Sequence, residues 1–238
     1  MKTIYTTLAL FISLLISFVS FPLRANEVRQ FKLSGFRGVE IGSAFEVHIK
    51  KSATHSVSAE GASEDIDNLQ FDIDKGVLEV YFKDSGRSWS FKTRNHKVIL
   101  HIGMPELKEA EFTGAAKMTL SGFTNEEEIK LYFSGASKGI IEAIEVSKLS
   151  LELSGASKVM VSGKTLKLNI NANGASSIQA FPLQAKDADI DLSGASKAEI
   201  SVKNSLRVDA SGASKVAYKG NPTISRDLSG AAKVIHEE

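Results

Sequence analysis

The sequence predicts an all-β protein whose second half is a β-solenoid, a stack of similar coils. A phrase related to Ser-Gly-Ala-Ser-Lys returns seven times, and its glycines are separated by 21, 20, 19, 20, 18 and 18 residues, the near-constant period of a repeat protein. These glycines are Gly114, Gly135, Gly155, Gly174, Gly194, Gly212 and Gly230. Apolar residues occupy the positions two and four before most of the glycines, which is the period of a β-strand. No stretch shows a helical period of 3.6 residues, so crossover helices are not expected.

Residues 1–25 have the layout of a secretory signal. Lys2 precedes an apolar run over 4–21, and Ala25 supplies the small residue at which we expect cleavage. The alternative is an uncleaved anchor, since the run is about long enough to cross a bilayer. The sequence contains no cysteine, which excludes a lipid-modified cysteine, a disulfide framework and a thiolate metal site. We therefore expect an exported protein of the periplasm or the outer cell surface.

The composition indicates a folded chain without a nucleic-acid partner. Hydrophobic residues make up 42% of the 238 residues, enough for a substantial core. There are 29 basic and 28 acidic residues, and nucleic-acid binding generally needs a basic surplus. After residue 25 no apolar run approaches membrane-spanning length, so no membrane span is expected after signal cleavage.

Residues 26–104 are predicted to form short strands that begin the solenoid and cap one end. Apolar and polar residues alternate at Val39 and Ile41, over 45–49 and over 98–102, which indicates strands with one buried face. Gly76 and Gly86 lie where turns are expected. Pro105 marks the entry into the repeat, which we place over residues 105–238.

Each repeat is predicted to be a strand, a Ser-Gly-Ala-Ser corner, a second strand and a short polar connection. Glycine allows a positive φ at the corner, alanine is small enough for the inside of a tight bend, and the serine hydroxyls can bond to corner backbone groups. Identical residues would then stack about 4.8 Å apart. An antiparallel meander would also alternate, but it gives no reason for one corner sequence to recur.

An ordered set of motifs over nearly the whole mature chain resembles the family known as the auto-transporter adhesin, head GIN domain. The set comprises Phe36-Arg-Gly-Val-Glu-Ile41, Gly76-Val-Leu-Glu-Val80, Met104-Pro-Glu-Leu107, the repeated corners, Tyr218-Lys-Gly-Asn-Pro222 and Ser229-Gly-Ala-Ala-Lys233. The resemblance implies a right-handed parallel β-helix-like fold, export from a Bacteroidetes cell and adhesion.

A lysine stands three residues after six of the seven glycines. These candidate ligand-binding residues are Lys117, Lys138, Lys158, Lys197, Lys215 and Lys233, and Ser177 interrupts the series. Three residues before the glycines, acidic residues prevail: Glu111, Glu152, Asp191, Asp209 and Asp227. One interpretation is a solvated surface on which the two columns partly compensate each other. The other is that the lysines hold an anionic polymer through repeated weak contacts.

Three smaller candidates remain open in the sequence. Asp187, Asp189 and Asp191 alternate on one strand, where calcium would need further ligands from a neighbouring coil. His96 and His101 project to opposite faces of a strand and make a poor metal pair. Trp89 and Phe91, with Tyr81 nearby, either stack on a sugar or cover one end of the core.

No catalytic pattern is present in the sequence. It contains no nucleophile elbow, no His-Glu-x-x-His and no glycine-rich phosphate loop, and no cofactor is implied. We therefore expect a non-enzymatic surface or periplasmic binding protein that contacts a polysaccharide or another envelope component. The alternative is a carbohydrate-processing enzyme of the β-helix type, which would need converging acidic or basic groups.

Overall fold

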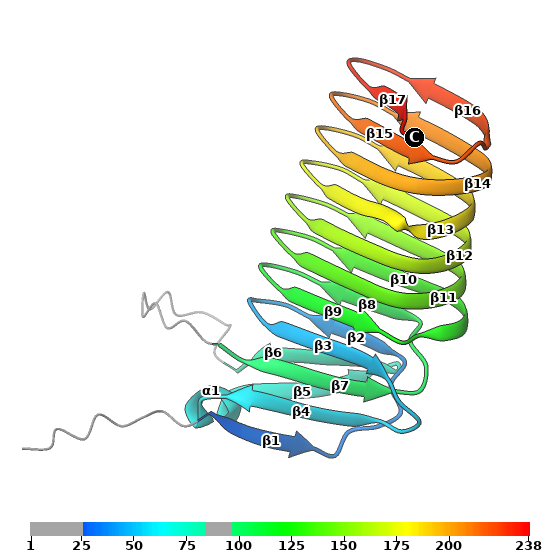
Figure 1. The fold of residues 1–238 in the computed structure, drawn as a ribbon. Helices are drawn as coiled ribbons and strands as arrows, with labels where there is room; N and C mark the ends of the chain where they lie inside the picture. The colour runs from blue at the N-terminus through cyan, green and yellow to red at the C-terminus, as the bar shows by residue number, and fades with distance from the viewer. Residues whose placement is uncertain (1–25, 84–96) are drawn as a thin grey trace, which may run out of the picture.

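The computed structural model describes residues 26–83 and 97–238, and within them the chain is all-β apart from one short helix (Figure 1). Successive coils stack along one axis and pair through parallel strands. The prediction of an all-β solenoid is therefore confirmed, and the motif glycines delimit about six turns.

The coils form two parallel ladders that meet at the glycine corners. Face A is the ladder of strands that directly follow the corners in the chain. Four short strands lie wholly on it: β3 (Glu46–Lys51), β9 (Lys117–Ser121), β15 (Lys215–Lys219) and β17 (Lys233–His236). Four long strands contribute only their first parts: β11 (Lys138–Leu153), β12 (Lys158–Ala172), β13 (Ser177–Leu192) and β14 (Lys197–Ala210). Face B precedes the corners: β2 (Gly38–Ile41), β8 (Glu109–Phe112), β10 (Thr124–Phe133), the last parts of β11 to β14, and β16 (Thr223–Leu228).

Antiparallel strands close the N-terminal end of the stack. β1 (Glu27–Phe31) pairs with β4 (Ser56–Gly61), β4 pairs with β7 (Ile99–Met104), and β5 (Leu69–Asp74) pairs with β6 (Val77–Phe82). β6 and β7 in turn pair in parallel with β2 and β3, so the antiparallel strands continue both ladders. Helix α1 (Ser63–Asp67) lies between β4 and β5 and buries Ile66.

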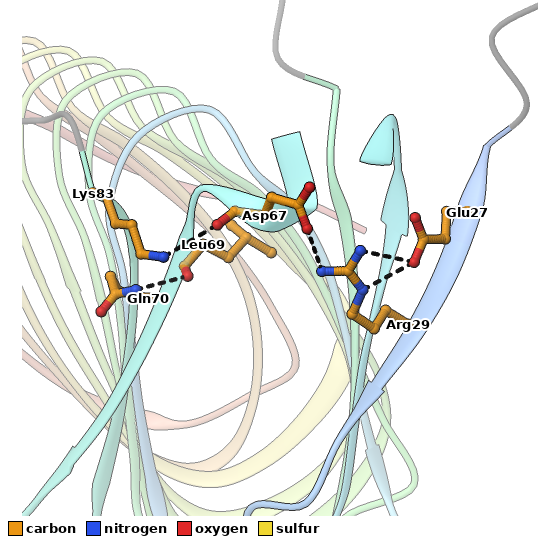
Figure 2. Close-up of polar contacts among 6 residues, drawn as sticks. All are labelled: Glu27, Arg29, Asp67, Leu69, Gln70 and Lys83. Atoms are coloured by element: carbon orange, nitrogen blue, oxygen red, sulfur yellow. Dashed lines mark hydrogen bonds and ion pairs between the residues drawn. The ribbon is translucent and has the colours of Figure 1, made fainter. Parts of the chain in front are cut away.

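Polar contacts at the surface join β1 to the end of α1 (Figure 2). The Arg29 guanidinium donates to Glu27 at 2.9 Å and to Asp67 at 2.6 Å. The hydrogen bond from Arg29 lowers the pKa of the Glu27 carboxyl, and the same bond raises the pKa of Arg29. These groups are solvated, so the network positions the cap strand more than it stabilises the fold.

The core is a set of inward columns, one residue from each coil. In the column two residues before the glycine, Phe112, Phe133 and Leu153 are almost fully buried, and the two phenyl rings stack with centroids 5.5 Å apart. Each coil contributes a similar apolar side chain at the same position of its strand, so one buried column runs from coil to coil. Within each strand buried and exposed residues alternate, as the period-two pattern predicted.

The corner glycines have φ between 69° and 76°, the left-handed region that other residues rarely adopt. The coils also approach closely at the corner: the amide of Ala136 donates to the Gly114 carbonyl at 2.7 Å, and Ala156 donates to Gly135 at 2.8 Å. A Cβ on Gly155 would lie 2.5 Å from the Gly135 oxygen. Glycine is therefore required by conformation and by space.

The alanine after the glycine points outward, although it was expected on the inside of the bend, whereas the serine that follows bonds to a corner backbone group as expected. The alanines, such as Ala136 and Ala156, are exposed, whereas the following serines are buried. The Ser157 hydroxyl donates to the Ser154 carbonyl at 3.0 Å, and Ser214 donates to Ser211 at 2.8 Å. Serine fits the inside of the bend because its hydroxyl satisfies a corner carbonyl that no coil amide reaches.

An additional corner precedes the seven in the repeat. Ser43 has φ 69°, and the amide of Ala115 donates to its carbonyl at 3.0 Å, the bond that each later alanine makes to a glycine. Ser43 therefore occupies the glycine position of a corner between β2 and β3. The sequence did not reveal this corner, because serine stands where the repeat has glycine.

In the four middle coils the return side is a bend within a continuous strand, not the short connection that was expected; short connections do join β9 to β10 and β15 to β16. β11, β12, β13 and β14 each run from one corner to the next. The register between neighbouring coils shifts at these bends, between Ile141 and Ile144 in β11 and between Ala180 and Gln184 in β13. Differences in repeat length are thus taken up on this side, away from the corners.

Candidate functional site

The six predicted lysines form one row on face A, directly beside the corners. Cross-strand pairing places Lys138 between Lys117 and Lys158, and Lys215 between Lys197 and Lys233, while Ser177 occupies the rung between Lys158 and Lys197. This row, called the lysine ladder below, has neighbouring backbones about 4.8 Å apart. Its side chains are exposed or half-buried, so their ammonium groups are available to a ligand.

The lysine ladder is largely unpaired. Lys197 forms an ion pair with Glu199, and Glu46 stands in the same row next to Lys117. Within residues 26–83 and 97–238, no other lysine of the ladder lies within ion-pair distance of a carboxylate. Closely spaced ammonium groups repel one another, so the ladder favours a counter-charge from outside the molecule.

An acidic row lies on face B, on the other side of the corners, and it is longer than the sequence suggested. Glu40 and Glu79 of the N-terminal strands continue the row that passes through Glu111 and Tyr132 to Glu152 and beyond. Burial, and then the nearby carboxylates led by Glu152, raise the pKa of Tyr132. No ion pair in the described residues joins the acidic row to the lysine ladder across the exposed glycine–alanine edge. The opposite charges are therefore segregated.

A groove on the return side of the coils was not predicted. It has a volume of about 1040 Å³ and is lined by residues of six successive coils, at the bends opposite the corners in Figure 1. Its lining includes carboxylates on the first coils, lysines on the later ones and apolar side chains between them. The lining residues do not recur in identity along the repeat, so the sequence offered no signal for it.

The described residues of the smaller sequence candidates make local contacts. Asp187 accepts a hydrogen bond from Ser205 at 2.5 Å, and within residues 26–83 and 97–238 no group of three or more His, Asp or Glu side chains is placed to hold a metal. His101 stacks on His48 with ring centroids 5.2 Å apart. Tyr81 donates to Asp72 at 2.5 Å, a bond that raises the pKa of the phenol.

Some predicted elements lie outside the described residues. They are the signal at 1–25, the turn at Gly86, the histidine at 96, and the aromatic pair Trp89 and Phe91. The sugar-stacking hypothesis for that pair stays a prediction.

Similar coils that stack on one another and pair through parallel strands define the class of repeat β-solenoid proteins. Within this class, the chain belongs to the family described as "Putative auto-transporter adhesin, head GIN domain", whose model matches residues 35–222. Membership of this family implies export. Among the described residues, no helix has the length and apolar character needed to cross a membrane.

Solved structures from Bacteroides and Parabacteroides species share the fold. A "putative adhesin" from Bacteroides fragilis is 19% identical with a TM-score of 0.78, over 90% of this chain and 96% of that one. A "putative lipid binding protein" from Parabacteroides distasonis is 20% identical with a TM-score of 0.71, over 90% and 97%. A "putative adhesin" from Parabacteroides merdae is 15% identical with a TM-score of 0.68, over 90% and 96%. No match was found among proteins of curated function.

Proposed function

We propose that the protein is an exported, non-enzymatic binding protein that holds an acidic polysaccharide of the envelope or of a host surface along its lysine ladder. The observation that carries the proposal is the placement of six exposed or half-buried lysines in one row, one to a coil. Corner geometry alone requires glycine and a small inward residue, but it makes no demand on the residue that follows. The recurrence of lysine there therefore points to a use for its charge.

A row of weak contacts suits a polymer better than a small anion. One exposed ammonium–carboxylate contact contributes roughly 0–1 kcal/mol, too little for specific binding. A polymer that engages one rung presents its next charges to the adjacent rungs at high effective concentration, so the contacts add. The rung at Ser177 interrupts the charge but supplies a hydroxyl that can bond to a sugar.

Apolar side chains beside the ladder add a second kind of contact. Ile140 and Met160 are the next outward residues after Lys138 and Lys158, and they are 36% and 40% exposed. They stand side by side on adjacent strands. Such a surface can pack against the apolar face of a sugar ring while the lysines bind its carboxylates.

Family and surface together favour binding over catalysis and an outer-surface or periplasmic location. The related structures carry the names of adhesins or of a lipid-binding protein, not of enzymes. On faces A and B the charged groups extend as rows along the coils, and in the return-side groove the carboxylates and most of the lysines stand on different coils. Acid–base catalysis instead requires groups that converge on one point.

The test compares binding of polygalacturonate to the mature protein and to two quadruple variants. One carries Lys138→Gln, Lys158→Gln, Lys197→Gln and Lys215→Gln. The control carries Lys75→Gln, Lys108→Gln, Lys130→Gln and Lys167→Gln, which removes the same charge from exposed positions off the ladder. We expect the ladder variant to bind at least about ten-fold more weakly, with a flatter salt dependence, while the control stays within about two-fold.

Two results would overturn the proposal. One is equal weakening in both variants, which would mean that only net charge matters. The other is a parent protein that binds neither polygalacturonate nor heparin. Melting temperatures of both variants should match that of the parent, because the substituted side chains are solvated.

A further inference from the structure

We propose that the groove on the return side holds a single-chain anionic amphiphile, with its acyl chain over an apolar floor and its head group at the lysines of β13 and β14. This site is separate from the lysine ladder and does not depend on it. The proposal commits to a monomeric ligand with one alkyl chain and one carboxylate or phosphate head.

The floor of the groove is apolar across four adjacent strands. Val146, Thr165, Ala185 and Val202 stand in one row, paired from strand to strand, and all are buried. Three of them belong to the core, so the row closes the base of the groove and the open apolar surface comes from side chains beside it. The Thr165 hydroxyl is engaged with the backbone carbonyls of Ser147 at 3.4 Å and Lys167 at 3.0 Å. Its polar atom is therefore satisfied, and the row as a whole offers no unsatisfied polar group to an acyl chain.

One large apolar side chain borders this floor in the open. Leu166 of β12 is 56% exposed, although it lines the middle of the groove. Four adjacent strands span roughly 14 Å at the usual inter-strand spacing, a length that suits a medium acyl chain. An alkyl chain laid along the row would cover Leu166 and remove apolar surface from water.

The carboxylates of the groove lie toward its N-terminal end and the lysines along the rest. Glu126, Glu127 and Glu145 line the end nearer the N-terminal coils, whereas Lys164, Lys186, Lys203 and Lys219 line the remainder. Glu126 is nearly buried and is ion-paired with Lys51 at 2.5 Å, so its charge is already compensated. The lysine end therefore attracts an anionic head group, and the exposed carboxylates Glu127 and Glu145 repel it.

Two lysines are best placed for the head group. Lys186 and Lys203 directly follow the floor residues Ala185 and Val202, which are paired on adjacent strands. Both are exposed, and neither forms an ion pair with a carboxylate in the described part of the chain. Lys219 is engaged with the backbone oxygen of Glu238 and lies 5.4 Å from the centre of the Phe181 ring. A head group at the first two lysines thus lies next to the floor.

The size of the groove fits a ligand of this kind. Its volume of about 1040 Å³ lies at the upper end of small-molecule sites, which typically combine an apolar lining with a few charged groups. An acidic polysaccharide would need polar contacts along the full length, and the floor does not supply them. The lining therefore favours an amphiphile over a polymer here.

The experiment measures calorimetric binding of dodecyl phosphate below its micelle concentration to the mature protein. Butyl phosphate has the same head with a short chain, and dodecyltrimethylammonium has the same chain with the opposite charge. We expect saturable one-to-one binding of dodecyl phosphate and at least about ten-fold weaker binding of the other two. Equal binding of butyl phosphate, or of the cation, overturns the proposal.

Matched variants locate the site. Leu166→Glu, Leu166→Gln and the double variant Lys186→Glu with Lys203→Glu should each weaken dodecyl phosphate binding at least about five-fold. The controls Ile73→Glu, an exposed apolar residue outside both the groove and the lysine ladder, and Lys130→Glu with Lys167→Glu should stay within about two-fold. Equal losses in the controls, or binding seen only with anionic vesicles and never with monomeric dodecyl phosphate, would show that the groove is not the site.

Discussion

Replacing a corner glycine in the middle of the stack tests why the corner requires glycine: because the coils approach closely there, or because the backbone has a positive φ. Gly194 has φ 73°, and a Cβ there would lie 2.6 Å from the Gly174 carbonyl oxygen and 3.1 Å from the Gly174 nitrogen. A left-handed conformation costs alanine about 1–2 kcal/mol. The contact forces the coils apart and weakens the bond from the Ala195 amide to Gly174, now 2.7 Å, at a further cost of about 1 kcal/mol.

The loss of chain entropy in the unfolded state offsets part of this cost, by about 0.4–1 kcal/mol. Gly194→Ala should therefore lower the free energy of unfolding by about 1–2.6 kcal/mol, or the Tm by roughly 2–10 °C. Gly122→Ala is the matched control, because Gly122 has φ 79° but its Cβ would meet only Lys51 at 3.8 Å. Urea unfolding followed by circular dichroism measures both. If Gly194→Ala costs no more than Gly122→Ala, the argument from close coil approach is refuted.

Two further predictions concern buried and paired polar groups. Ser157→Ala removes the hydrogen bond from the Ser157 hydroxyl to the Ser154 carbonyl and should lower the free energy of unfolding by about 1 kcal/mol. Ser196→Ala should be neutral or stabilising, because the buried Ser196 hydroxyl has no partner in the described residues. Equal unfolding free energies for the two variants would contradict this. The hydrogen bond from Lys148, 2.7 Å from Glu128, lowers the pKa of that carboxyl, so its stabilising effect is present above the unfolded value and lost as the pH falls through the folded one. Glu128→Gln should thus be less stable than the parent at pH 7, and the urea midpoints of the two proteins should draw together as the pH is lowered; a gap that stays constant from pH 7 into the acid range would contradict the assignment.

The fold was predictable wherever one residue type is required at every coil. Glycine must recur at the corners because both φ and coil spacing exclude a side chain, and this requirement produced the visible period. The corner at Ser43 was not predicted, because a serine with positive φ stands where the repeat has glycine, and the fold tolerates its strain. The antiparallel pairing of β1 and β4 was not predicted either, because alternation of apolar residues indicates that a strand has a buried face but not the direction of the strand beside it.

The candidate sites divide in the same way. The lysine row could be read from the sequence because its members keep a constant distance from the glycines. The groove could not, because its floor changes from Val146 to Thr165 to Ala185 and only the shared register brings these residues together. The inward orientation predicted for the corner alanine was wrong, because alanine and serine are both small and the sequence alone does not show which of them fills the inside of the bend.

The register shifts at the bends have a consequence for how such a molecule can change over time. Because the shifts confine differences in coil length to the return side, an insertion or deletion there alters the groove without displacing a corner. Duplication of a whole coil would instead lengthen the lysine ladder by one rung and leave both ends of the stack as they are. A lineage can therefore vary what the groove accommodates and how long a polymer the edge spans by separate kinds of genetic event, and selection on one need not disturb the other.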